Sequence, residues 1–247
     1  MSGSLGSPLA AFRQALQPAA ETRALARVAR EPDLKHTMEV FRKAVERAPD
    51  IKAALRDPRV LAVIGTALGI AQASSQPGLA SRALLSDLKD PKSVANTLSD
   101  KRWKEAAASL KLTTGGIKAL RDPKVQATLL DGLQRARLRE EQDAQTPGLG
   151  DALEFTTRAS RAHNSIDVLG DAVLRRVVTG ALGLPQQLAI QSVEAQARAV
   201  DSRLKVAKLQ NPAEVRKLAE RYLISMQGND STTPSNTSGL AQYGFNV

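Results

Sequence analysis

The sequence predicts an all-α, multi-helix protein built from two similar helical repeats. Of the 247 residues, 42% are hydrophobic but only 3% are aromatic, so the core must be aliphatic. Few aromatic and few β-branched runs disfavour a β-sandwich or barrel. Apolar residues recur at spacings of three and four, as on one face of a helix. Asp-Pro and Asn-Pro pairs also recur where helices are expected to begin.

Four such pairs each follow a leucine by two residues and predict helix starts. An Asp or Asn side chain at the N-cap accepts hydrogen bonds from free backbone N–H groups. Proline suits the first helical position because its missing N–H would be unpaired there. The four predicted starts are Asp57-Pro58, Asp90-Pro91, Asp122-Pro123 and Asn211-Pro212.

Two apolar stretches predict core helices in the first half. The first is a stripe that ends before Pro49 and consists of Leu34, Met38, Phe41, Val45 and Ala48. The second is the run from Val60 to Ala71, whose twelve residues are the longest apolar stretch. A bilayer span needs about 20 such residues, so no membrane span is predicted.

Two further stripes predict helices in the second half. One predicts a helix of about 22 residues after Pro185, the longest in the chain, with a seam as narrow as that of a coiled coil. Its stripe is Ile190, Val193, Ala197, Val200, Leu204 and Ala207. The last helix is expected to bury Val215, Leu218, Ala219, Tyr222 and Met226.

An internal similarity predicts the domain organisation. Residues 57–70 align without gaps to residues 171–184, and both segments end in a Gly–aliphatic pair, as a helix C-terminus would. We therefore expect two repeats, 33–114 and 117–227, with a linker or long loop at 140–150. Residues 1–32 are predicted to be flexible or partly helical. Residues 228–247 are predicted to be a polar tail, whose Tyr243 and Phe245 belong to a docking element or to an unconstrained terminus.

The sequence offers no recognisable catalytic constellation. The absence of cysteine excludes disulfides, zinc ribbons, iron–sulfur clusters and thiol nucleophiles. His36 and His163 are expected at the surface, and Thr113–Gly116 is expected to form a turn rather than a phosphate loop. Glu140, Glu141 and Glu154 are expected on solvated helix faces rather than as a paired-acid site. We predict no enzyme activity and no catalytic, cofactor-binding or metal-binding residue.

The net positive charge of the chain is compatible with a second class of function. Thirty-five Lys and Arg against 25 Asp and Glu give a net charge of +10. A basic chain can bind nucleic acid or another anionic surface. The excess is spread along the chain, however, and its densest patch, Arg135, Arg137 and Arg139, is followed at once by Glu140 and Glu141. No basic block with interleaved aromatic residues is present, so nucleic-acid binding is the weaker alternative.

The ordered motifs resemble a bacterial domain-of-unknown-function family encoded among the flagellar genes of alphaproteobacteria. The resemblance is carried by DPRVLAVIGTALGI (57–70), by Asp90-Pro91, Ala95-Asn96-x-Leu98 and Asp100-x-Arg102-Trp103, and by LGDAVLRRVVTGALGLP (169–185) with LQNPAEVRKLAERYL (209–223). Leu68 replaces the aromatic residue that the family has before its first glycine, and Leu110 and Leu112 replace phenylalanines.

The resemblance implies an all-helical fold and a role in flagellar structure or assembly. The expected partner is a protein, namely a flagellar or export component. It would cover aliphatic patches beside basic residues such as Arg175 and Arg176. The N-terminal residues have neither the basic region nor the long apolar region of a Sec signal peptide, so a cytoplasmic or flagellum-associated location is expected. The oligomeric state is left open by the sequence.

Overall fold

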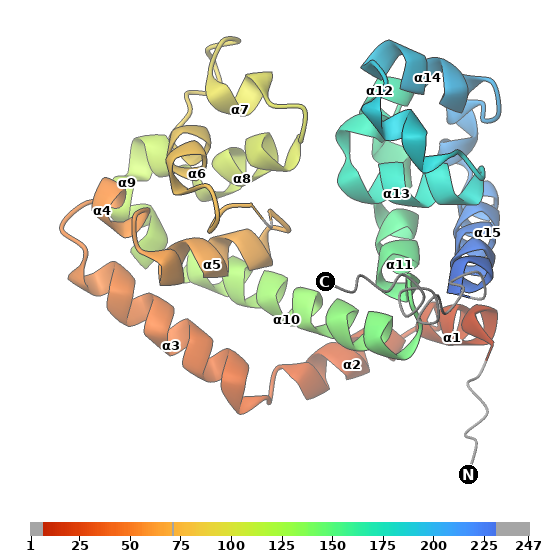
Figure 1. Ribbon diagram of the computed structural model, residues 1–247. Coiled ribbons are helices and arrows are strands. Elements are labelled where there is room, and N and C mark those ends of the chain that lie inside the picture. Colours follow the sequence, from red (N-terminus) through yellow and green to blue (C-terminus); the bar gives the residue numbers. More distant parts are fainter. Residues whose placement is uncertain (1–6, 71, 231–247) are drawn as a thin grey trace, which may run out of the picture.

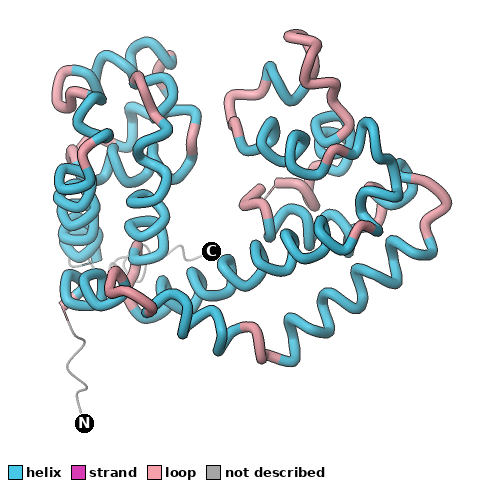
Figure 2. The backbone as a smooth tube through the Cα atoms, turned by 180° about the vertical axis from the view of Figure 1, so that it is seen from behind, coloured by secondary structure: helices cyan, strands magenta, loops and turns pink. Residues whose placement is uncertain are grey.

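The computed structural model of the chain describes residues 7–70 and 72–230. In this part the regular structure consists of α-helices and short 3-10 helices without any strand, which confirms the all-α prediction. Figure 1 shows two groups of helices that rise side by side from a shared base, and Figure 2 shows the same arrangement from behind. Each group contains its own buried hydrophobic cluster.

The first unit (residues 20–145) is organised around its longest helix, α10. The hydrophobic faces of α2, α3, α5 and α9 pack against α10, and α6 packs on α8. Trp103, the only tryptophan of the chain, is buried in this unit. Its helices are α2 (Ala20–Val28), α3 (Pro32–Arg47), α4 (Ile51–Ala54), α5 (Pro58–Ala67), α6 (Pro77–Leu84), α7 (Val94–Thr97), α8 (Arg102–Leu110), α9 (Leu112–Arg121) and α10 (Pro123–Gln145).

In the second unit (residues 8–15 and 149–230), α11, α13 and α15 all pack against one another. Helix α1 contacts both α11 and α15, and its Phe12 is fully buried in the second hydrophobic cluster. The described part of the N-terminal segment thus contains two helices, α1 and α2, which are joined by a turn. The elements are α1 (Pro8–Ala15), α11 (Leu149–Arg158), η1 (Ala159–Arg161), α12 (Ser165–Gly170), α13 (Ala172–Ala181), η2 (Gln186–Ile190), α14 (Val193–Asp201), η3 (Val206–Gln210) and α15 (Pro212–Asp230).

The boundary between the two buried clusters lies later in the chain than residues 114–117, where the sequence predicts the boundary between the repeats. The first cluster extends to Leu138 and the second resumes at Leu149. The cause is α10, whose leucines complete the first cluster before the chain crosses to the second unit. The prediction of a linker or long loop at 140–150 is wrong, because α10 continues through Gln145 and only residues 146–148 separate it from α11. The predicted tail lies mostly outside the described residues.

Two segments 114 residues apart share local geometry. Asp50 and Asn164 each cap a short helix with nearly the same backbone angles (φ −148°, ψ 174° and φ −148°, ψ 172°). Asp57 and Asp171 then cap α5 and α13. These shared features cover only 50–70 and 164–184. The main neighbours of α5 are α10 and α3, and those of α13 are α15 and α11. The two complete repeats stay a prediction.

The prediction of one long helix after Pro185 is wrong. The segment forms η2, α14 and η3, with bends between them. Ser192 accepts a hydrogen bond from the N–H of Ala195 and starts α14, while the Gln196 amide donates to the carbonyl of Gln191 at 2.8 Å. Such side-chain bonds to the backbone compete with a continuous helix. Ile190, expected in the buried stripe, is 89% exposed.

Asp90-Pro91 forms a turn and does not start a helix. The Asp90 carboxylate accepts the N–H of Lys92, and the Asn96 amide donates to the carbonyls of Leu88 and Asp90. These bonds fold the chain back before α7 begins at Val94. The other three predicted starts are confirmed at α5, α10 and α15.

Tyr222 of α15 fills a site shaped by two glycines. A Cβ atom on Gly180 would lie 2.7 Å from the ring, and one on Gly148 would lie 3.0 Å from it. The hydroxyl donates to a carboxylate oxygen of Asp151 at 3.4 Å. Burial, reinforced by the Asp151 charge, raises the pKa of Tyr222 to about 12.

We therefore expect an alkaline loss of stability that depends on Tyr222. Because the folded state holds the phenolic proton more tightly, this contribution is complete below about pH 10 and is lost between about pH 10 and pH 12. After allowance for solvent screening, it should amount to about 1–2 kcal/mol. Denaturant unfolding across this range should show that Tyr222→Phe has a flatter pH dependence than the wild type. Equal slopes would contradict the assignment.

Candidate functional site

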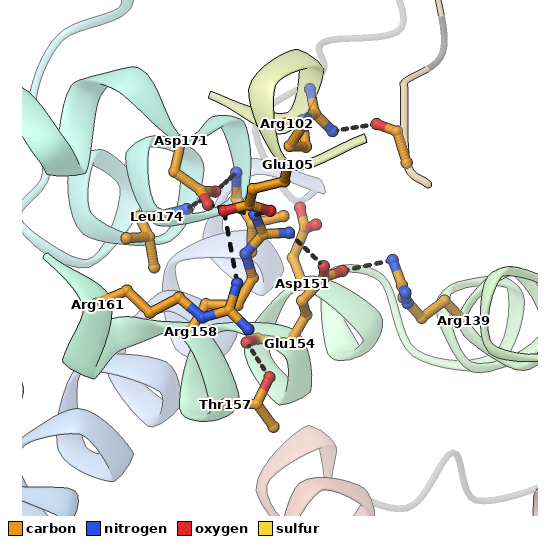
Figure 3. A network of polar contacts seen from close by, with 12 residues as sticks. Arg102, Glu105, Arg139, Asp151, Glu154, Thr157, Arg158, Arg161, Asp171 and Leu174 are labelled. Carbon is orange, nitrogen blue, oxygen red and sulfur yellow. Dashed lines mark hydrogen bonds and ion pairs between the residues drawn. The ribbon is translucent and has the colours of Figure 1, made fainter. Parts of the chain in front are cut away.

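The junction between the two units contains a network of charged side chains centred on Arg158 (Figure 3). Arg158 lies in the last turn of α11, and its side chain is only 12% exposed. Its guanidinium contacts the carboxylate of Asp171 at 2.7 Å and that of Glu154 at 2.9 Å. Both carboxylate groups are also largely buried, with 14% and 15% of their side chains exposed. This is a buried ion triad.

The triad also determines how α13 begins. Asp171 is the N-cap of α13, where its Oδ1 accepts the N–H groups of Val173 and Leu174, while its Oδ2 faces Arg158. The carboxylate thus lies at the positive end of one helix dipole, and Arg158 lies near the negative end of another. Burial alone would lower the pKa of Arg158, but Asp171 and Glu154 hold it above its ordinary value. The guanidinium therefore stays charged.

Ionic contacts extend the network to the first unit. Glu105 of α8 lies 3.6 Å from Arg161 and 3.8 Å from Arg158, and Arg139 of α10 pairs with Glu154 at 2.5 Å. Farther along the junction, Lys101 pairs with Asp167 at 3.0 Å. Ion pairs thus connect the two units at several points.

A cleft of about 780 Å³ lies beside this network. Its walls are α1, the α1–α2 connection, α2, α10 and α11. Its apolar lining includes Leu16, which is 37% exposed, and the half-buried Leu153. Five arginines and three glutamates also line it: Arg27, Arg135, Arg139, Arg158, Arg161, Glu21, Glu141 and Glu154.

A second hollow is an apolar groove of about 510 Å³ on the first unit, between α3, α5 and α10. Its lining is mostly apolar: Leu34, Thr37, Val40, Ala62, Val63, Thr66 and Leu133. Its charged or polar rim consists of His36, Arg59, Arg137 and Glu140. Both guanidinium groups of the rim are paired with carboxylates, Arg59 with Asp57 at 2.6 Å and Arg137 with Glu31 at 3.0 Å.

The structure places the two histidines at the surface, as expected. His36 is exposed on α3 at the rim of the groove. His163 is exposed between η1 and α12, where its backbone N–H donates to Asp167. Thr113–Gly116 lies in the first half of α9, which is kinked at Gly116 (φ 53°, ψ −144°). His36 shares the rim of the groove with Glu140, whereas His163 lies apart from that groove and from the cleft.

The three glutamates considered as a paired-acid site each lie against an arginine. Glu140 and Glu141 face Arg137, Glu141 also pairs with Arg27, and Glu154 joins the triad. The hydrogen bond from Arg27 lowers the pKa of Glu141, which keeps that carboxylate ionised. A general acid needs a raised pKa instead.

The densest basic patch is also neutralised by acidic partners. Arg135 pairs with Asp131 and Glu21, Arg137 pairs with Glu31, and Arg139 pairs with Glu154. These three side chains therefore do not form an unpaired basic surface for nucleic acid. In the second unit Arg176 binds Asp151 with two contacts of 2.6 and 2.7 Å, and Arg175 is exposed on α13.

One of the motifs that carry the family resemblance connects two helices of the first unit. Arg102 pairs with Asp100 at 2.7 Å and donates to the carbonyl of Gly69, which has a positive φ of 69° just after α5. Trp103 beside it is 2% exposed. The Asp-x-Arg-aromatic motif thus joins the start of α8 to the end of α5.

Sequence reasoning missed the network around Arg158. Two local signals were present, namely the helix start at Asp171 and the i, i+4 spacing of Glu154 and Arg158 on α11. Arg158, Glu105 and Arg139 come from three helices, and no spacing in the sequence links them. Among the described residues, no cluster of His, Asp and Glu has a metal-binding arrangement. Within the same part, no helix is both long and apolar enough to cross a bilayer.

Comparison with known proteins identifies the family but no activity. The solved structure of protein AGR_C_984 from Agrobacterium tumefaciens has a similar fold, with a TM-score of 0.73 and 24% sequence identity over 91% of this chain and 94% of that one. No curated protein matches in sequence. A family model described as a protein of unknown function (DUF1217) matches residues 67–215. Because this match spans more than half of the chain, the protein belongs to the DUF1217 family.

Proposed function

We propose that this protein is a non-enzymatic, flagellum-associated structural or assembly protein that binds another protein through its helix faces. The flagellar part of the proposal rests on the resemblance of its ordered motifs to a family encoded among flagellar genes. The binding part rests on one observation, the apolar groove between α3, α5 and α10.

The groove suits an amphipathic helix of the partner. Leu34, Thr37 and Val40 follow one another at three-residue spacing on α3, opposite Ala62 and Thr66 on α5. Two such helix faces can hold the apolar stripe of a third helix, which is a common mode of peptide recognition. Because Arg59 and Arg137 on the rim already have carboxylate partners, the apolar floor of the groove rather than the charge of its rim would select the partner helix.

The test is a pull-down of the tagged full-length chain from its native cells with nuclease treatment, at about 0.15 M and about 0.5 M salt. Ala62 is exposed and lines the groove, so Ala62→Glu should place a charge there without disturbing the core. Glutamate and alanine are both good helix formers. The matched control is Ala108→Glu, because Ala108 is equally exposed on α8 and does not line the groove.

We expect flagellar or export proteins to be retained at both salt concentrations by the wild type and by Ala108→Glu. Their recovery should fall at least tenfold with Ala62→Glu. Retention of the same proteins by both variants would overturn the groove as the docking site. Recovery of nucleic acid or ribosomal proteins that are lost at high salt would favour the anionic-surface alternative instead.

A further inference from the structure

The cleft beside the Arg158 network has features of a binding site that the groove does not explain. Its volume of about 780 Å³ lies within the common range for ligand sites, roughly 300–1,000 Å³. It also combines an apolar lining with polar groups from several elements, and this combination is typical of binding sites.

Three glutamine side chains in the cleft have free amide groups. Gln14 from α1 and Gln142 and Gln145 from α10 line it, and within the described part of the chain their side chains make no hydrogen bond. A primary amide both donates and accepts hydrogen bonds. The same pairing of donor and acceptor recurs along a peptide backbone. These groups therefore suit a peptide.

The guanidinium groups of the cleft differ in how fully they are neutralised. Arg158 has two close carboxylates, and Arg139 has Glu154. Arg161 is 63% exposed, and the one ion pair found for it among the described residues is the 3.6 Å contact to Glu105, itself 53% exposed. Arg161 is thus available to bind a carboxylate of a ligand.

The backbone at the wall of the cleft is also unusual. Ala19, which lines the cleft between α1 and α2, has a φ of 63°. A residue with a Cβ atom adopts this left-handed conformation at an energetic disadvantage. Such conformations are concentrated at ligand-binding and switch regions.

We propose that this cleft binds an acidic peptide segment of the protein partner, with apolar side chains against Leu16 and Leu153 and a carboxylate at Arg161. The free amides of Gln14, Gln142 and Gln145 would hydrogen-bond the peptide backbone. The inference rests on the proposed function, because it names a second site and the chemistry of the segment that such a partner presents.

The test uses the purified full-length chain and a displayed library of random short peptides. Enriched peptides should contain an excess of Asp and Glu together with aliphatic residues. Fluorescence anisotropy should then show that Arg161→Ser weakens their binding about tenfold, as expected for the loss of a charge-assisted hydrogen bond. Gln142→Ala should weaken it by about threefold.

Arg198→Ser is the matched control, because Arg198 is exposed on α14 and does not line the cleft. Thermal melts followed by circular dichroism should show that all three variants remain folded. Failure to enrich peptides, peptides without acidic residues, or equal binding by Arg161→Ser would overturn the inference. Binding of a single-stranded oligonucleotide that needs Arg161, without peptide enrichment, would also overturn it.

The two proposals can fail separately. Ala62→Glu changes the groove and should leave binding of the library peptides unchanged. If the pull-down finds no groove-dependent partner but the peptides bind through Arg161, the groove is rejected and the cleft remains. If the pull-down succeeds and no acidic peptide is enriched, only the cleft is rejected.

Discussion

Replacing Gly132 by alanine should lower the free energy of unfolding of the first unit by about 3 kcal/mol, at the upper end for overpacked substitutions. Gly132 lies within α10, where α5 packs against it. A Cβ atom there would stand 2.2 Å from the carbonyl oxygen of Ala67 and 2.8 Å from its carbonyl carbon. Both atoms belong to the backbone, so no side-chain rotation relieves the clash, and the two helices must move apart.

The helix propensity of alanine opposes this effect without cancelling it. Alanine in a helix interior is favoured over glycine by roughly 0.5–1 kcal/mol. A glycine at this position therefore indicates that close approach of α5 and α10 is worth more than that difference. Separating the helices would also loosen the first hydrophobic cluster, in which Leu129 and Leu133 of α10 are buried.

The matched control is Gly78→Ala in the first turn of α6. A Cβ atom there would meet nothing within 4 Å, so this variant should be unchanged or up to about 1 kcal/mol more stable. Urea unfolding followed by the fluorescence of Trp103 reports on the first unit specifically, because this single tryptophan is 2% exposed there. Equal stability of the two variants would show that α10 and α5 tolerate a larger separation.

Local signals in the sequence were sufficient for much of this fold. The stripe of Leu34, Met38, Phe41 and Val45 faces the core of the first unit, as helical spacing predicts. Asp57 and Asp122 begin α5 and α10 because capping depends on atoms two or three residues away. Both kinds of signal lie within a few residues of the structure they determine.

The same signals failed where nearby side chains compete for the backbone. Asp90-Pro91 has the composition of a helix start, but the Asn96 amide holds the preceding carbonyls in a turn. After Pro185 the stripe correctly identifies Ala197 and Val200 as buried. It fails at Ile190, because a Ser192 cap and a Gln196 amide interrupt the helix. Periodicity carries no information about such interruptions.

The two hollows and the charged junction could not be predicted from sequence, for a different reason. Each is lined by helices distant in the chain, as when Glu21 of α2 faces Arg135 of α10. The basic patch of Arg135, Arg137 and Arg139 illustrates why such contacts escape prediction from sequence. The patch is conspicuous in the sequence, yet each guanidinium pairs with a carboxylate outside α10 once the chain folds.

Replacing Arg158 by methionine should destabilise the protein by about 3–5 kcal/mol, the usual effect of removing one member of a buried ion pair. The loss of attraction is the smaller part of this effect. Glu154 would keep its contact with Arg139, but Asp171 would remain largely buried without a cation, and an unpaired buried carboxylate is strongly unfavourable. Because Asp171 also caps α13, its displacement toward solvent would weaken that helix start.

Arg161→Met is the matched control, one helical turn further along. Its side chain is 63% exposed, and its one ion pair among the described residues is the 3.6 Å contact, so the change should be within about 0.5 kcal/mol. Arg158→Lys keeps the charge but not the planar fork that reaches both carboxylates, and should recover only part of the stability. Denaturant unfolding followed by circular dichroism measures all three. Equal destabilisation by Arg158→Met and Arg161→Met would exclude the buried triad as the source.

A second substitution distinguishes an unpaired carboxylate from a simple packing defect at Arg158. In Arg158→Met the largely buried carboxylate of Asp171 has lost its 2.7 Å contact with the guanidinium, which leaves a negative charge without its cation. Adding Asp171→Asn removes that charge and keeps a side chain that can cap α13. The double variant should therefore be more stable than Arg158→Met alone in denaturant unfolding. A packing defect without an electrostatic component would leave the double variant no more stable than the single one. Recovery in the double variant therefore identifies the triad as an electrostatic connection between α11 and α13, at the point where the two units meet.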